Sequence, residues 1–226
     1  MTTPITPSEK ALFIHFARIG KALANPIRLE LLELLGQAPR SVERLAELLA
    51  ESVAATSHHL QALRAANLVE GRKQGLFVTY RLADELVGTL WELVQELANR
   101  QLVELREQAA NAAGGGDPSE NIDVTTLTAR LRRGEVTLID VRPREEYAAA
   151  HIPGALSAPL EDLEDVLPTL PPDRDIVAYG RGPLSALPAA AVALLRRHQR
   201  SALRLAEGIA QWRAAGLPVL AGAPGP

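Results

Sequence analysis

A run of glycine, proline and polar residues at positions 114–120, GGGDPSE, divides this chain of 226 residues into two parts with different hydrophobic patterns. Its composition is typical of a linker. Before it, apolar residues recur at helical spacing, and after it short apolar runs alternate with helical segments. Each part is long enough to bury a core of its own. The sequence therefore predicts one domain over residues 1–113, a linker at residues 114–120 and a second domain over residues 121–226.

The first part contains several consecutive helix patterns. They are predicted over residues 8–23, 25–36, 41–50 and from residue 52 up to Asn67. Pro26 lies in the first turn of the second helix, where its missing N–H is tolerated. Ser41 is placed as the N-cap of the third helix, and Asn67 tolerates the left-handed conformation that ends many helices.

Residues 52–82 concentrate positive charge in a chain whose formal net charge is −3 at pH 7. Four basic residues and one acidic residue give this stretch a net charge of 4 − 1 = +3. They are Arg64, Arg72, Lys73, Arg81 and Glu70. Two apolar segments, residues 68–69 and 76–82, flank a predicted hairpin turn at residues 71–75, in which glycine would supply the positive φ of a tight turn.

The helix that starts at Ser52 is predicted to have two chemically different faces. Leu60 and Leu63 lie on one face. The other face carries short or planar hydrogen-bonding groups that suit base edges and phosphates. These are Ser57, His58, Gln61 and Arg64. Composition alone leaves two interpretations open: a surface that binds nucleic acid, or a helix and hairpin that belong to a core and expose solvated charges.

The order helix, turn, helix and basic hairpin resembles the winged helix-turn-helix of the arsenic-repressor (ArsR-type) family of bacterial transcriptional regulators. The motifs that carry the resemblance are LANPIR at 23–28, SHHL at 57–60, LR at 63–64, NLV at 67–69 and YRL at 80–82. The resemblance covers residues 8–110. It implies a homodimer that binds double-stranded DNA at an inverted-repeat operator, with repression as the family's usual effect.

We expect the DNA contacts to come from the helix after Ser52 and from the hairpin, which would be the wing. The helix residues expected at or beside the DNA are Ser52, Val53, Ala54, Ser57, His58, His59, Gln61 and Arg64. The wing residues expected on the phosphate backbone are Arg72, Lys73 and Gln74.

A long helix is predicted over residues 84–113, after the hairpin. Its apolar stripe is wider than a single contact requires. The stripe consists of Leu86, Leu90, Leu93, Val94, Leu97, Leu102 and Leu105. The resemblance implies that this helix forms the homodimer interface, because one winged helix reads only one half-site. The alternative is a helix that packs only within its own chain.

The second part is predicted to be an α/β domain around a mostly parallel sheet, because strand and helix patterns alternate along it. Strands are predicted at 136–141, 176–179 and 202–205, and helices at 187–197 and 209–215. Several motifs resemble those of a rhodanese domain over residues 121–220. They are DVR at 140–142, EEY at 145–147, HIPGA at 151–155, EG at 207–208 and WRAAGLPV at 212–219. The fold class is therefore a multidomain α and α/β chain.

The resemblance implies a catalytic cysteine in the loop after the 176–179 strand, but Gly180 stands at that position. The chain contains no cysteine at all, which excludes disulfides, thiolate metal sites and cysteine nucleophiles. Glycine has no side chain, so sulfur transfer by the family's mechanism is excluded. Two interpretations stay open: the loop's amides bind a small anion, or the domain is an inert scaffold that kept its fold. The residues expected at the anion site are Gly180, Arg181, Gly182, Pro183, Leu184 and Ser185, with Arg142 nearby.

Metal, cofactor and membrane functions find no support in the sequence. His15 lacks a second ligand at metal-binding spacing, and residues 84–113 contain no histidine, so we expect no metal and no cofactor. No apolar run approaches the length of a membrane span, and MTTPITPSEK has no apolar signal core, so we expect a cytoplasmic protein.

Three functions remain open. The first is a dimeric DNA-binding regulator with a ligand-binding or vestigial second domain. The second is an inactivated form of a DNA-associated sulfurtransferase, and the third is a regulator whose rhodanese-like domain recruits a protein partner.

Overall fold

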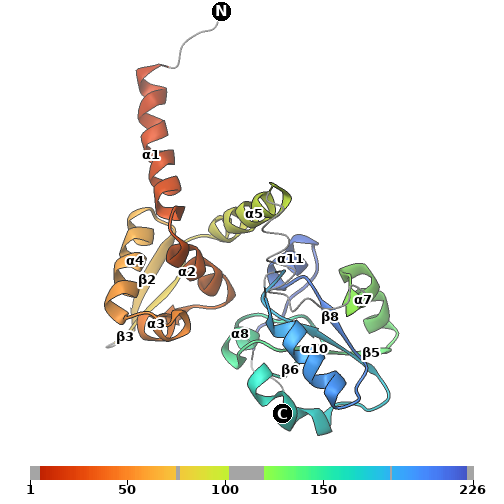
Figure 1. The fold of residues 1–226 in the computed structure, drawn as a ribbon. Coiled ribbons are helices and arrows are strands. Elements are labelled where there is room, and N and C mark those ends of the chain that lie inside the picture. Colours follow the sequence, from red (N-terminus) through yellow and green to blue (C-terminus); the bar gives the residue numbers. More distant parts are fainter. Residues whose placement is uncertain (1–5, 75–76, 102–119, 184, 223–226) are drawn as a thin grey trace, which may run out of the picture. The chain divides into compact units, whose positions relative to one another are not determined.

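The computed structural model describes residues 6–74, 77–101, 120–183 and 185–222 (Figure 1). The chain forms two compact units, residues 1–95 and 96–226. The predicted domain boundary at residue 113 and most of the predicted linker lie outside the described residues. Among the described residues, no helix combines the length and the apolar composition that crossing a bilayer requires.

The first unit consists of helices and a small antiparallel sheet. Its helices are α1 (Pro7–Leu23), α2 (Pro26–Gln37), α3 (Val42–Leu49), α4 (Val53–Ala65) and the beginning of α5 (Glu85–Gln101). Its described strands are β1 (Arg40–Ser41), β2 (Val69–Gln74) and β3 (Phe77–Leu82), in the spatial order β1-β3-β2. The predicted hairpin and the first four predicted helices are therefore confirmed, and the fifth is confirmed as far as Gln101, after which it lies outside the described residues. Strand β1 was not predicted.

Side chains at the helix ends explain why the helices begin and end where they do. Asn25 accepts a hydrogen bond from the N–H of Arg28 at 3.2 Å, and Ser41 accepts one from the N–H of Arg44 at 3.3 Å. Ser52 caps α4 in the same way, through the N–H of Ala55 at 3.1 Å. Asn67 has a φ of 56°, so it ends α4 in the left-handed conformation that the sequence predicted.

The predicted hairpin turn at residues 71–75 was placed too early. Residues 71–74 belong to β2, where Gly71 pairs with Tyr80 and Gln74 pairs with Phe77. Gly71 is needed for space and not for a positive φ. A Cβ there would lie 3.1 Å from Val78 Cγ1 and 3.2 Å from Tyr80 Cε1. The basic residues next to Gly71 are consequently held on a strand, which gives them a fixed direction.

The core of the first unit joins α2, α3 and α4 to the wing. The largest fully buried side chains are those of Leu31, Leu32, Leu45, Leu60 and Leu63. Arg40, in β1, is also buried, and its guanidinium donates to the carbonyls of Leu34 and Ala38. The Leu34 carbonyl also accepts from the N–H of Ala38, so Arg40 adds a second donor at the end of α2.

Helix α5 is attached to α2 by hydrogen bonds to one carboxylate, that of Glu33. Trp91 Nε1 donates to Glu33 Oε2 at 2.7 Å, and Gln95 Nε2 donates to the same oxygen at 3.4 Å. Gln37 Nε2 donates to Glu33 Oε1 at 3.4 Å. Trp91 and Gln95 are four positions apart and share one face of α5, so the network holds that face against α2.

The second unit is an α/β domain around a parallel sheet, as predicted. Its strands are β4 (Asn121–Ile122), β5 (Val136–Asp140), β6 (Leu156–Ser157), β7 (Asp175–Tyr179) and β8 (Ala202–Leu205). Its helices are α7 (Val124–Arg132), α8 (Arg144–Ala149), α9 (Leu163–Val166), α10 (Leu187–Arg197) and α11 (Ile209–Ala214), with short 3-10 turns η2 (Leu160–Asp162) and η3 (Leu167–Thr169). The strand order is β4-β8-β7-β5-β6, and every pair is parallel.

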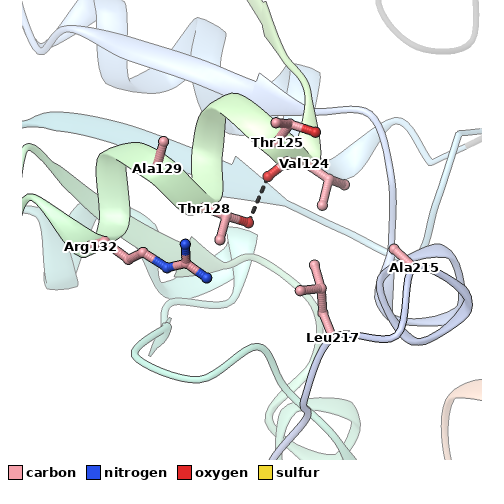
Figure 2. A pocket seen from close by; sticks show the side chains of 7 residues that line it. All are labelled: Val124, Thr125, Thr128, Ala129, Arg132, Ala215 and Leu217. Carbon is pink, nitrogen blue, oxygen red and sulfur yellow. Dashed lines mark hydrogen bonds between the residues drawn. The ribbon is translucent and has the colours of Figure 1, made fainter.

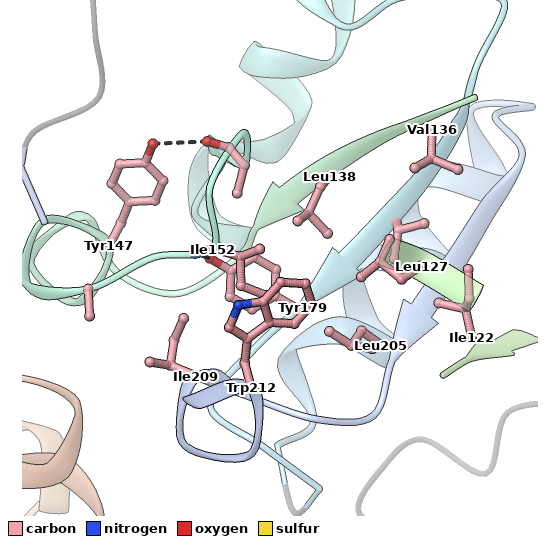
Figure 3. Close-up of a cluster of buried hydrophobic side chains, with 13 residues drawn as sticks. Ile122, Leu127, Val136, Leu138, Tyr147, Ile152, Tyr179, Leu205, Ile209 and Trp212 are labelled. Carbon is pink, nitrogen blue, oxygen red and sulfur yellow. Dashed lines mark hydrogen bonds between the residues drawn. The ribbon is translucent and has the colours of Figure 1, made fainter. Parts of the chain in front are cut away.

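Successive residues of the central strands point into different cores on the two faces of this sheet. Leu138 packs with α7, α8 and α11, whereas the next residue, Ile139, packs with α9 and α10. Figure 3 shows the first of these cores, in which the Trp212 and Tyr179 rings lie at the centre. With helices on both faces, the central strands β5 and β7 are buried along almost their whole length, so they appear in the sequence as continuous apolar runs.

Candidate functional sites

Helix α4 presents a polar face away from the core of the first unit. Thr56, Leu60 and Leu63 are buried on one side of the helix. The opposite side includes His58 and Gln61, which are three positions apart and both exposed. The two-faced helix that the sequence predicted is confirmed.

The structure separates the predicted DNA-contact residues by exposure. Those that are exposed are Ser52, Val53, Ala54, His58, Gln61, Arg64, Arg72 and Lys73. Ser57 and His59 are half-buried, and Gln74 is the last residue of β2. His59 follows His58 by one position, which turns it about 100° around the helix axis and away from the most exposed face.

The positive charge of this region comes from residues on α4 and β2. Arg81 on β3 forms an ion pair with Glu70 on β2, and these two charges cancel. The net charge of +3 therefore rests on Arg64, Arg72 and Lys73, which are all exposed. A polar helix face beside a basic strand is the arrangement that suits base edges and phosphates together.

Apolar side chains of α1 and α5 are left exposed in the single chain. On α1 the exposed fractions are 54% for Phe13, 67% for Ile14 and 59% for Phe16. On α5, Leu86 and Leu93 are 71% and 57% exposed. The α5 stripe was predicted from the sequence, and its members Leu102 and Leu105 lie outside the described residues. The sequence places Leu12, Phe13, Phe16 and Ile19 on one side of this helix, but their exposure was not predicted.

A buried ion pair organises the strand ends beneath the loop at position 180. Asp140, at the end of β5, accepts hydrogen bonds from Arg142 Nε at 2.9 Å and from the Tyr179 hydroxyl at 2.6 Å. Arg142 Nη2 also donates to the Ala150 carbonyl at 2.7 Å. Burial lowers the pKa of Arg142, but hydrogen bonding and the charge of Asp140 outweigh it and raise the pKa overall. Burial, followed by the charge of Asp140, raises the pKa of Tyr179.

The expectation that Arg142 faces an anion at the loop needs correction. Its side chain is 1% exposed, and Asp140 and the Ala150 carbonyl hold its guanidinium. The sequence could not show this, because an arginine two positions after an aspartate at a strand end suits either an internal ion pair or an open site.

Arg181 is also engaged by a carboxylate. Its Nε lies 3.0 Å from Glu146 Oε1 and its Nη2 lies 2.8 Å from the same oxygen. The Glu146 side chain is fully buried on α8, and that of Arg181 is 25% exposed. The positive charge at the loop is therefore balanced from within the fold. Glu146 belongs to the EEY motif, but that motif does not indicate which residue pairs with it.

The loop after β7 is closely packed around Gly180. A Cβ at this position would lie 2.8 Å from Ser185 Oγ and 2.9 Å from Pro188 Cδ. The neighbouring Gly208 approaches the loop even more closely, since a Cβ there would lie 2.1 Å from the Arg181 carbonyl oxygen. Serine and proline atoms thus stand beside Gly180 in the space that a larger side chain would use.

The loop's own amides are only partly available. Pro183 has no N–H, and the N–H of Ser185 donates to the Gly182 carbonyl at 2.9 Å. Leu184 lies outside the described residues. Helix α10 begins at Leu187 without a side-chain cap and with Pro188 in its first turn. The binding of a small anion at this loop stays a prediction.

Comparison with known proteins identifies both parts of the chain. Residues 23–72 match the family described as Helix-turn-helix domain, and residues 123–215 match the Rhodanese-like domain. The HTH-type transcriptional regulator Rv0324 of Mycobacterium tuberculosis is 45% identical over 216 residues, which are 96% of this chain and 95% of that protein. The chain therefore belongs to the ArsR-type helix-turn-helix transcriptional regulators that carry a C-terminal rhodanese-like domain.

Further similarities follow the two units separately. A sulfurtransferase of Allochromatium vinosum is 36% identical over 101 residues, which are 44% of this chain and 94% of that protein. A solved winged helix-turn-helix DNA-binding domain from Mycobacterium bovis, described as homodimeric, is 40% identical and covers 46% of this chain and 95% of its own, with a TM-score of 0.42.

Proposed function

We propose that this transcriptional regulator binds an inverted-repeat operator as a homodimer, with α4 in the major groove and the β2–β3 wing on the phosphate backbone. The observation that carries the proposal is the exposed face of α4, with His58 and Gln61 next to the basic strand residues Arg72 and Lys73. The major groove is about 12 Å wide and admits a helix. A dimer on its operator would block transcription, so repression is the proposed effect.

The proposed dimer rests on the exposed apolar faces of α1 and α5. Large apolar side chains that gather on a surface favour association. Phe16 on α1 and Leu93 on α5 are each more than half exposed in the single chain, at 59% and 57%. A symmetric pair of chains would bury both faces and would give two α4 helices for two half-sites.

Binding of the wing to phosphates can be tested by the salt dependence of operator affinity. Selection from random duplexes supplies the operator. We expect Arg72→Ala with Lys73→Ala to weaken binding to all sequences and to reduce the slope of log Kd against log salt by about one unit for each lost phosphate contact. We expect Gln61→Ala to change base preference while keeping the slope.

The matched control for the wing removes two exposed charges from the second unit, Arg174→Ala with Arg213→Ala. Its net charge equals that of the wing variant, so a general electrostatic effect would change both slopes equally. A slope that falls only in the wing variant supports the proposed contact. An unchanged slope in the wing variant would place the wing away from the backbone.

We further propose that the rhodanese-like domain does not transfer sulfur and instead serves regulation, as a ligand-binding or interaction module. Gly180 directly follows β7 at the proposed nucleophile position, and the chain has no thiol to carry a persulfide. Incubation with thiosulfate and cyanide should yield no thiocyanate above the buffer rate. Enzyme-dependent thiocyanate would contradict this role and favour a sulfurtransferase.

A further inference from the structure

A cleft of about 350 Å³ opens on the second unit between α7 and the segment that follows α11 (Figure 2). Its volume lies at the lower end of the roughly 300–1,000 Å³ that small-molecule sites occupy. One wall is a single face of α7, and the other is the chain after α11. The lining residues are Val124, Thr125, Thr128, Ala129, Arg132, Ala215 and Leu217.

Most of this lining is apolar and is anchored to the core. Val124 and Leu217 are partly buried and pack against the core shown in Figure 3. The Thr128 hydroxyl donates to the Val124 carbonyl at 2.7 Å, as the dashed line in Figure 2 shows. Its donor is used within the helix, so the methyl group and the oxygen lone pairs are what it offers to a ligand. The cleft therefore suits an apolar body.

Arg132 is the single charged residue in this lining, and it differs from the arginines beside it. Arg130 Nη2 lies 2.6 Å from Asp175 Oδ2, and Arg133 Nη2 lies 3.1 Å from Glu135 Oε2. Within the part of the chain that the structure describes, Arg132 has no such partner. Figure 2 shows its side chain extending from α7 toward the side on which Leu217 lies. No acidic side chain is among the described lining residues to neutralise it.

We propose that this cleft binds a small monocarboxylate with an apolar body, such as a short aliphatic acid. The planar guanidinium of Arg132 matches a carboxylate in two parallel hydrogen bonds. The apolar body would lie along α7 toward Val124 and Leu217. One cation in an otherwise uncharged lining favours a ligand with one negative charge, whereas a phosphate would require further donors. The site is independent of the proposed DNA contacts.

Titration of the full-length protein with hexanoate, followed by the amide signals of residues 124–132 in NMR spectra, tests the proposal. We expect saturable shifts with hexanoate and affinity at least roughly tenfold weaker with the neutral isostere hexanamide, because a charge-assisted hydrogen bond is lost. Arg132→Gln should weaken hexanoate binding by a similar factor. Arg133→Gln, which removes the same charge one position away, should leave the affinity within about twofold.

A second variant tests the shape of the cleft. Thr125 is exposed at the rim, so Thr125→Trp can fill the cleft without disturbing the core, and it should abolish the shifts. Absence of saturable binding by the parent protein, equal binding of hexanamide, or an equal loss in Arg133→Gln would each overturn the proposal. Since the readout does not involve DNA, its failure would leave the proposed operator binding untouched.

Discussion

Placing a thiol at position 180 would test whether the loop has room for the cysteine that the rhodanese resemblance implies there. In Gly180→Cys the new Cβ would lie 2.8 Å from Ser185 Oγ, 2.9 Å from Pro188 Cδ and 3.0 Å from Pro188 Cγ. The Ser185 hydroxyl can rotate away, whereas the Pro188 ring is fixed in the first turn of α10. Overpacking of this kind costs roughly 1–3 kcal/mol. We therefore expect Gly180→Cys to lower the free energy of unfolding by about 2 kcal/mol.

Urea unfolding followed by tryptophan fluorescence measures this loss. Adding Pro188→Ala to Gly180→Cys should recover most of it, because the ring atoms that meet the new Cβ are gone. Adding Ser185→Gly should recover little. If Gly180→Cys is as stable as the parent protein, the space around Gly180 is larger than the structure indicates, and the reasoning fails.

The relieved variant, Gly180→Cys with Pro188→Ala, can then be tested for chemistry. A thiolate at position 180 would attack the outer sulfur of thiosulfate and release sulfite, and the chain would gain the mass of one sulfur atom. Ser185→Cys places a thiol in the same loop without adding a Cβ, so it is the control for ordinary thiol reactivity. A mass gain in Ser185→Cys alone would show that position 180 is not the nucleophile position.

Three further outcomes are expected. Phe16→Glu on α1 or Leu93→Glu on α5 should yield monomers by light scattering and lose operator binding. The control Arg18→Glu, at an exposed position about half a turn around α1 from Phe16, should remain dimeric. Gly208→Ala should lower the free energy of unfolding of the second unit by more than about 4 kcal/mol in urea, because the new Cβ would overlap the Arg181 carbonyl. The control Gly134→Ala has open space around the new Cβ but a φ of 66°, so it should cost only about 1 kcal/mol. Trp91→Phe removes a 2.7 Å hydrogen bond to Glu33 and should weaken operator binding more than it weakens dimerisation. Equal losses in the two assays would show that this hydrogen bond does not orient α5.

Local patterns predicted most of the elements because each depends on a few neighbouring residues. Asn25, Ser41 and Ser52 act as caps through side-chain contacts three residues away, and Asn67 ends α4 by its own backbone conformation. Such effects are contained within one helical turn, so the sequence shows them directly. The buried strands of the second unit were equally visible, as apolar runs of four to six residues.

Predictions failed where a residue's role depends on a distant partner. The hairpin turn was placed at Gly71 because glycine often marks a turn, but Gly71 lies within β2 and leaves room for the Tyr80 ring across the strand pair. Strand β1 was missed because two residues carry no periodic pattern, and its identity comes from pairing with Thr79 and Tyr80. These are contacts between segments that are far apart in the sequence.

The same limitation explains why arginines near the loop of the second unit resembled anion ligands. Asp140 and the Ala150 carbonyl hold Arg142, and the buried Glu146 holds Arg181. Removing one partner of a buried ion pair leaves an uncompensated charge and costs roughly 3–5 kcal/mol. Stability alone is therefore a sufficient reason for these side chains. Their presence indicates a fold that is maintained, and only position 180 itself, where glycine stands, bears on whether the loop can carry sulfur.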